Sequence, residues 1–159
     1  ELSNLMLFAD FDRQQSLFSK PRKIWILIFC LKNKIRSLIL PSVEDVAAGK
    51  WYSDAIAWAA NNGIVTGYAD GTFLPERNIT REQFAAMLYN YAKLRGMGFQ
   101  GAWYFPLNFT DSDQISAWAN EAMHWCVMKK IVAGSDGKLL PKALATRAEA
   151  AAVISRYIK

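Results

Sequence analysis

The chain has 159 residues, of which 52% are hydrophobic and 13% aromatic, and this composition argues against a wholly disordered protein. Its net charge of +5 is concentrated at one end. Residues 1–40 carry seven Lys and Arg against three Asp and Glu, whereas residues 41–159 carry twelve against eleven. Because the larger part is nearly neutral, the charge predicts no nucleic-acid partner.

Residues 1–40 differ in composition from the rest and contain none of the nine glycines. Eight consecutive apolar residues run from Ile24 to Leu31, too few for a transmembrane helix, which needs roughly 20. No small-residue cleavage site follows this run, as it would in a signal peptide. We therefore expect an atypical, poorly ordered N-terminal segment, no transmembrane span, and no function for these residues.

The pattern of a folded domain begins at residue 41. Ser53 or Asp54 can cap a first helix, and Gly63 can end it in the left-handed conformation. A glycine-cornered turn, GYADGTFLP, follows at residues 67–75. This order predicts a helix that is followed by a structured loop.

A second kind of helix begins at a capping box. Thr80 precedes Gln83 by three residues, the spacing at which a threonine and a glutamine cap each other's backbone N–H groups. Thr146 and Glu149 repeat the pattern near the end of the chain. We expect a helix to start at each of these threonines.

These features belong to an internal repeat. Pairs 66 residues apart are Asp45 and Asp111, Gly71 and Gly137, Pro75 and Pro141, Thr80 and Thr146, and Arg81 and Arg147; pairs 67 apart are Trp58 and Trp125, Ile64 and Ile131, and Gly67 and Gly134. The repeat predicts a mainly α protein of tandem helix–loop–helix units, each too small to bury its apolar faces alone. We assign residues 41–96 to the first unit, 97–108 to a linker and 109–159 to the second unit.

The sequence contains no recognisable catalytic or metal-binding constellation. His124 is the only histidine and is expected to be a half-buried helix residue. Cys30 and Cys126 belong to no cysteine pair or ligand cluster, so we expect small buried apolar side chains. The two Asp-Gly turns lack the alternating acidic ligands of a calcium loop. We therefore predict no enzyme, no cofactor and no metal site.

Arg81 and Arg147 occupy an unusual place, directly after the capping threonine, where the helix dipole is positive and a cation is slightly unfavourable. One explanation is a strut between repeats, in which each arginine pairs with an acid such as Asp45 or Asp111. The other is an anion site, in which the guanidinium and free helix N–H groups hold a carboxylate or phosphate. The residues alone leave both explanations open.

Four tryptophans occupy repeated positions. Trp58 and Trp125 lie at helical spacing and are expected in the core. Trp51 and Trp118 begin their helices, where a partly exposed ring can stack on a sugar. A core position is favoured for these two as well.

Residues 43–92 and 109–158 resemble two consecutive S-layer homology motifs, most specifically in the stretches WYSDAI, GYADGTF and ITREQ. The resemblance implies tandem helix–loop–helix repeats that pack as part of a pseudo-threefold prism, with ligand grooves between neighbouring motifs. It also implies a non-catalytic extracellular module that holds a surface protein on the bacterial cell wall. The implied ligand is an acidic secondary cell-wall polysaccharide, often carrying pyruvate ketals.

The resemblance assigns ligand-binding roles to equivalent residues of both motifs: Asp45, Trp51, Gly67, Thr80, Arg81, Asp111, Trp118, Gly134, Thr146 and Arg147. The two arginines would grip the carboxylate of the acidic sugar, and the two aspartates would accept hydrogen bonds from its hydroxyls. This chain departs from the family pattern at Gln83, where the family has Glu, and at Lys130, where Gly63 predicts glycine.

Triplets of motifs are usual in this family, but a third does not fit here, since Asp10, in a motif-like opening, precedes Asp45 by only 35 residues. We interpret residues 1–40 as the remnant of a lost, truncated or out-of-frame first motif. The leading prediction is a polysaccharide-binding anchor. The alternatives are a structural element that self-associates through the face left by the missing motif, and the anchor fragment of a larger surface enzyme.

Overall fold

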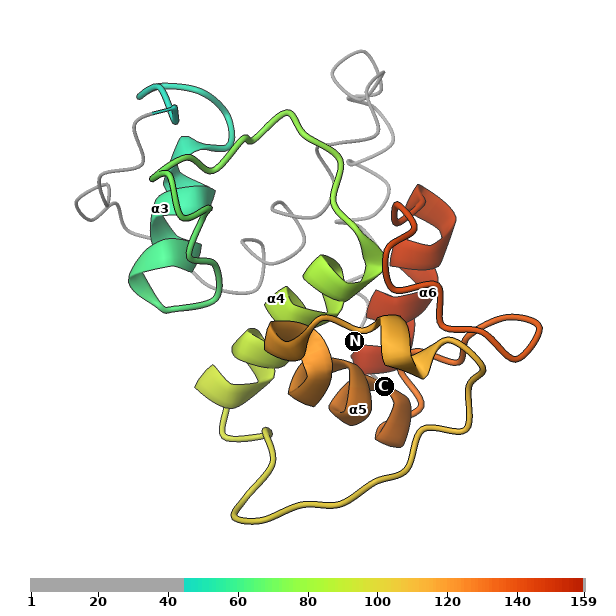
Figure 1. Cartoon of the computed structure of the whole chain (residues 1–159). Helices are drawn as coiled ribbons and strands as arrows, with labels where there is room; N and C mark the ends of the chain where they lie inside the picture. Colours follow the sequence, from blue (N-terminus) through green and yellow to red (C-terminus); the bar gives the residue numbers. More distant parts are fainter. Residues whose placement is uncertain (1–44, 159) are drawn as a thin grey trace, which may run out of the picture.

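The computed structural model describes residues 45–158, so the expectations for residues 1–40 and for Cys30 lie outside the described part (Figure 1). The α-helices of this part are α3 (Ser53–Asn61), α4 (Arg81–Leu94), α5 (Asn120–Met128) and α6 (Arg147–Tyr157), with short 3-10 helices η2 (Ser112–Gln114) and η3 (Ala117–Ala119). Extended pairing in these residues amounts to two isolated bridges. The prediction of a mainly α protein is confirmed.

Each motif is a helix–loop–helix unit, α3 and α4 in the first and α5 and α6 in the second. Both predicted capping boxes are present. The Thr80 hydroxyl accepts from the Gln83 N–H and the Gln83 side chain accepts from the Thr80 N–H, and Thr146 and Glu149 make the same pair of bonds. The pseudo-threefold prism stays a prediction.

The start of α3 differs from the prediction, because neither Ser53 nor Asp54 caps it. Tyr52 occupies the capping position and makes no side-chain cap bond. The Ser53 hydroxyl is buried and donates to the Ala47 carbonyl at 2.7 Å, while it accepts from the Lys50 N–H at 3.0 Å. The serine therefore ties the turn before the helix instead of the helix end.

The main core lies between α4 and α5, which run beside each other in Figure 1, and takes in α6. Its fully buried side chains include Leu88 of α4 and Met123 and Cys126 of α5. Trp125 is 2% exposed, as predicted, and its indole N–H donates to the Met97 carbonyl at 3.0 Å. The core is therefore shared by the two motifs, which agrees with units too small to fold alone.

The two motifs also join through backbone hydrogen bonds at the start of α4. The Arg81 N–H donates to the Ala143 carbonyl at 2.9 Å, and the Glu82 N–H donates to the Pro141 carbonyl at 3.1 Å. In the other direction, Ala145 N–H donates to the Ile79 carbonyl at 3.0 Å. These bonds seat residues 140–145 of the second motif, here called the docking segment, on the N–H groups that a helix start leaves without intrahelical partners.

Equivalent loop positions have equivalent backbone angles even where the residue type changes. Gly63 has φ +68° after α3, and Lys130 has φ +58° at the same place after α5. The left-handed conformation is neutral for glycine but costs an L-residue roughly 1–2 kcal/mol. The second motif therefore carries strain that the first motif avoids.

We expect Lys130→Gly to raise the free energy of unfolding by about 1 kcal/mol, because glycine adopts this φ without strain. Chemical denaturation of the full chain measures the change. Lys129→Gly is the matched control: Lys129 has φ −79°, so glycine there relieves nothing and should destabilise by about 0.5–1 kcal/mol. Equal effects of the two substitutions would contradict the strain at Lys130.

Candidate ligand-binding groove between the motifs

A groove with a volume of about 860 Å³ lies between the two motifs. The first motif contributes residues 64–69, residues of the 73–79 loop and one side of α4. The second motif contributes Ser116, Trp118, Glu121, Ala122 and Ala145. Because both motifs supply its walls, the groove depends on their relative placement.

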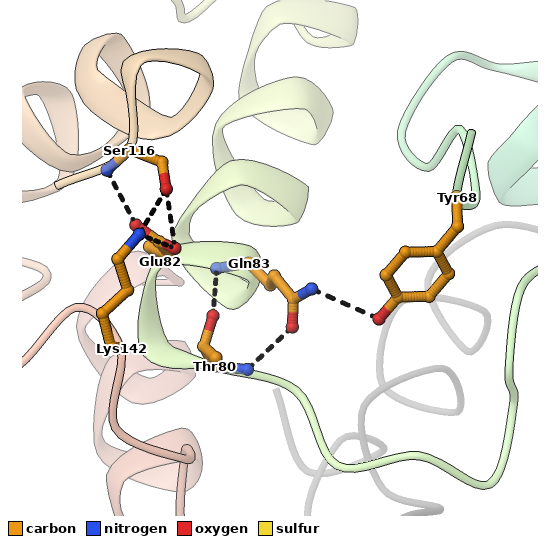
Figure 2. Close-up of polar contacts among 6 residues, drawn as sticks. All are labelled: Tyr68, Thr80, Glu82, Gln83, Ser116 and Lys142. Carbon is orange, nitrogen blue, oxygen red and sulfur yellow. Dashed lines mark hydrogen bonds and ion pairs between the residues drawn. The ribbon is translucent and has the colours of Figure 1, made fainter.

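The groove floor is organised around Glu82, the second residue of α4 (Figure 2). Its carboxylate is buried, and it accepts from the Ser116 N–H at 3.0 Å and from the Ser116 hydroxyl at 3.1 Å. The Lys142 ammonium lies 2.7 Å from the same carboxylate and also bonds the Ser116 hydroxyl. Charge and hydrogen-bonding capacity are therefore matched where the motifs meet.

The rest of the lining is mixed: it includes apolar side chains and the acid Glu121 together with aromatic and cationic side chains. The Trp118 ring is 58% exposed on the second-motif side. The first motif forms the opposite wall. There the Arg77 guanidinium lies 5.5 Å from the centroid of the Tyr68 ring, and the Lys93 ammonium lies 4.9 Å from the centroid of the Tyr89 ring. An exposed ring with nearby cations can stack on a sugar and attract its carboxylate.

Two of the ten predicted ligand-binding residues, Gly67 and Trp118, line this groove. The other eight lie elsewhere in the described structure: Asp45, Trp51, Thr80, Arg81, Asp111, Gly134, Thr146 and Arg147. The expectation that Trp51 and Trp118 are core residues is wrong, since Trp51 is 42% exposed and Trp118 is 58% exposed. Of the two exposed rings, the one on the second motif faces the groove.

Arg81 makes an ion pair between the motifs. Its Nη1 lies 3.2 Å from Glu149 Oε1, so the strut has a different acidic partner from the Asp45 or Asp111 considered from the sequence. The amides at the start of α4 are also bonded, to Ala143, Pro141 and the capping Thr80. An anion at this helix start would find its N–H groups already in use.

Arg147 differs from its counterpart. It is exposed, and its side chain makes no ion pair or hydrogen bond within residues 45–158. Thr146 caps α6 as Thr80 caps α4, with its hydroxyl 3.2 Å from the Glu149 N–H. The two arginines thus share a sequence position but not an environment.

Asp45 and Asp111 anchor the glycine-cornered loops. The Asp45 carboxylate accepts from the N–H groups of Phe73 and Leu74 at 2.8 and 2.6 Å. Asp111 accepts from those of Leu139 and Leu140, both at 2.8 Å. Burial acts to raise the pKa of Asp111, but the two N–H donors lower it below its ordinary value. Both oxygens of each carboxylate therefore hold backbone.

Gly67 and Gly134 form the corners of these loops, with φ of +71° and +70°. A Cβ at Gly67 would lie 2.7 Å from the Thr72 carbonyl oxygen, and one at Gly134 would lie 2.6 Å from the Lys138 carbonyl oxygen. Glycine is required at both positions because the two sides of the loop approach each other there.

Sequence reasoning missed Tyr68, Arg77 and Lys93 as groove residues. Tyr68 directly follows the predicted Gly67, but its repeat equivalent is Ser135. Because the site residues were chosen from positions that the two motifs share, Tyr68 was not among them. Arg77 likewise has Ala143 as its equivalent. For Tyr68 and Arg77 the signal was present in the difference between the motifs, whereas Lys93 has Lys159 as its equivalent and so gave no such signal.

The predictions for His124 and Cys126 agree with the described residues. His124 is half-buried, and its Nδ1 lies 2.8 Å from the Asn120 carbonyl oxygen. Burial raises the pKa of the Cys126 thiol to about 12, which makes it unreactive. Residues 45–158 hold no group of three His, Cys, Asp or Glu placed to bind a metal. Within this part, no helix has the length and apolar character needed to cross a bilayer.

Comparison with known proteins finds a matching protein family and several similar proteins. The model of the S-layer homology domain matches residues 44–85 and 108–151. The chain is 34% identical over 120 residues to a surface-layer 125 kDa protein of Lysinibacillus sphaericus and 30% identical over 117 residues to a cellulosome-anchoring protein of Acetivibrio thermocellus. It is 36% identical over 115 residues to an endoglucanase of Bacillus sp. (strain KSM-635).

The aligned regions cover 73%, 73% and 68% of this chain, respectively. They cover only 10%, 26% and 12% of the three relatives. The chain therefore corresponds to a small part of each of these proteins, and the similarity does not extend to the rest of them.

We expect Asp111→Asn to lower the free energy of unfolding by about 2 kcal/mol at neutral pH, since it replaces the charged acceptor of two N–H groups. Because the folded-state pKa is below the unfolded value of about 3.9, this stabilisation is present above that pH and is lost as pH falls through the folded pKa. Denaturation at several pH values measures it, with the difference between wild type and variant shrinking in acid. A pH-independent difference would contradict the role of the charge.

Proposed function

This chain belongs to the S-layer homology domain family, and on that premise we propose that it is a non-catalytic anchoring module at the bacterial cell surface. It binds an acidic secondary cell-wall polysaccharide, one that carries pyruvate ketals, and so holds a surface protein on the envelope. The observation that carries the proposal is the groove between the motifs, which combines the exposed Trp118 ring with the cations Arg77 and Lys93.

The groove suits a sugar acid better than a neutral apolar molecule. Trp118 offers an open ring face, and Tyr68 lies in the opposite wall with its hydroxyl accepting from the Gln83 side chain at 3.3 Å (Figure 2). The Glu82 charge in the floor is already matched by Lys142. Arg77 and Lys93 are then the cations of the groove that remain for a ligand carboxylate.

Within this proposal the predicted site residues have different roles. Gly67 and Trp118 shape the groove, while Asp45 and Asp111 position the loops. Arg81 holds the motifs together through Glu149. Arg147 is the repeat arginine whose guanidinium has no partner within residues 45–158 and lies outside the groove, where it is open to a ligand.

The relatives favour an anchor whose cargo varies. A cellulosome-anchoring protein and an endoglucanase share this region, and in both it is a minor part of the whole length. The parent of this chain could therefore be a surface enzyme that uses the module for attachment. Self-association is the second candidate role, and the observation that favours it is the open start of α6, treated below.

Binding to purified cell-wall polysaccharide, prepared with and without its pyruvate groups, tests the ligand. We expect the full chain to sediment with the native polymer and to lose at least about tenfold in affinity for the depyruvylated one, the loss expected for one charge-assisted contact. Equal retention on both polymers, or retention on neither, would rule out recognition of the carboxylate.

We expect Arg77→Ala to weaken binding to the native polymer by roughly 10- to 100-fold, as removal of one charged hydrogen-bond donor does. Arg77 is exposed, so its removal should leave the melting temperature unchanged. Lys129→Ala removes an exposed cation outside the groove and serves as the matched control, with unchanged binding expected.

Arg81→Ala separates the strut from the ligand-binding role. We expect a small loss of stability, less than about 1 kcal/mol for a partly exposed ion pair, and little change in affinity. A large loss of affinity at unchanged stability would return Arg81 to the binding site and refute its assignment as a strut.

A further inference from the structure

The start of α6 is an open copy of a surface that is occupied in the first motif. At α4, the N–H groups of Arg81 and Glu82 donate to the docking segment, residues 140–145. At α6, the equivalent N–H groups are those of Arg147 and Ala148, and they find no acceptor within residues 45–158. Glu82 is buried and Arg81 partly buried, whereas Arg147 and Ala148 are both exposed.

A matching segment exists on the first motif and is already in the docking conformation. Residues 74–79 are the repeat equivalent of the docking segment, and Leu74 and Leu140 share the unusual φ values of +53° and +52°. In both segments a turn is closed by the same bond, from the Arg77 N–H to the Leu74 carbonyl and from the Ala143 N–H to the Leu140 carbonyl. The two Asp anchors described above hold both loops in the same way.

Residues 74–79 are less buried than the docking segment at their shared proline, because no helix start covers them within the described residues. Pro141 is fully buried in its seat against α4, while its equivalent Pro75 is only half-buried. The carbonyls of Pro75 and Arg77, which correspond to the acceptors Pro141 and Ala143, receive no hydrogen bond within the described residues. Within residues 45–158, one motif thus presents an unused docking segment and the other an unused seat.

We infer that a second copy of this chain seats its residues 74–79 on the start of α6, in the register that residues 140–145 use on α4. In this register the carbonyls of Arg77 and Pro75 in one copy accept from the N–H groups of Arg147 and Ala148 in the other copy. The Ile79 N–H of the first copy donates to the Ala145 carbonyl of the second. Donors and acceptors match at all three positions because the same backbone pairing exists inside each molecule.

Geometry favours this occupant. Glu76 stands where the docking segment has Lys142, but Arg77 follows it, so residues 74–79 carry no net charge and the match rests on the backbone donors and acceptors. The seat and the segment are different surfaces, each present once per copy. The contact is therefore heterologous, so copies associate head to tail, into a closed ring or an open chain, and the assembled mass should rise with protein concentration.

Cross-linking tests the register. The isolated antiparallel bridge between Thr80 and Leu144 joins the segment to α4 within one chain, and its equivalent between copies joins Thr146 to Asn78. Opposite residues in such a bridge lie close enough for a disulfide. In a Cys30→Ser background, a mixture of Asn78→Cys and Thr146→Cys chains should form a disulfide-linked pair under mild oxidation. Thr80→Cys with Leu144→Cys in one chain is the positive control, which should close internally.

Ser155→Cys, at an exposed position late in α6, replaces Thr146→Cys as the negative control. A mixed pair that forms no faster than with this control overturns the inference. The mixture contains no polysaccharide, which matters because residues of the 73–79 loop also line the ligand groove. Failure here therefore leaves the proposed glycan binding untouched, and failure of glycan binding leaves this contact untouched.

Light scattering after size-exclusion chromatography tests the contact without added cysteines. We expect the mass of the wild-type chain to rise with concentration, and Arg147→Pro to shift this rise to about tenfold higher concentration by removing one N–H donor. Proline is favoured at the first position of a helix, so α6 and the melting temperature should be preserved. A monomeric wild type at every concentration, or association unchanged by Arg147→Pro, overturns the inference.

Discussion

The arrangement of the described residues depends on one buried carboxylate. Glu82 sits at the second position of α4 and is 3% exposed, so its charge must be matched inside the protein. Both of its partners, Ser116 and Lys142, come from the second motif. A buried charge whose partners lie on another unit is a weak source of stability but a strong source of specificity, since any other docking leaves it unpaired. The carboxylate thereby selects one relative placement of the motifs.

That placement creates the groove. Ser116 and Trp118 are two residues apart, so the hydrogen bonds that hold Ser116 against Glu82 also bring the Trp118 ring to the first motif. On the other side, Asp45 holds the backbone of the loop that carries Arg77. Asp45, Asp111 and Glu82 therefore act on backbone and on partners within the fold. The groove lining contains the exposed Trp118 ring and the cations Arg77 and Lys93, and it also includes Glu121.

Local features could be predicted from the sequence because they depend on neighbours within a few residues. The capping boxes at Thr80 and Thr146 and the glycine corner at Gly67 depend on spacing and backbone angle, and the repeat confirmed that neither was accidental. The partners of Arg81 and Glu82 could not be predicted in the same way, since Glu149 and Lys142 are sixty or more residues away. Trp118 was misjudged for a related reason: whether a ring at a helix start is covered depends on which unit packs there.

The two motifs share a backbone but have diverged in the side chains that use it. Position 82 is glutamate in the first motif, and its equivalent, position 148, is alanine; Arg77 likewise corresponds to Ala143. The Asp anchors and the threonine caps are kept, so the second motif still builds a docking segment and a helix start of the same shape. Its helix start has lost the carboxylate that selects a partner by charge, and what remains is a seat defined by backbone N–H groups. A seat of that kind discriminates by the shape of the segment alone, and residues 74–79 are a segment of that shape that this chain carries.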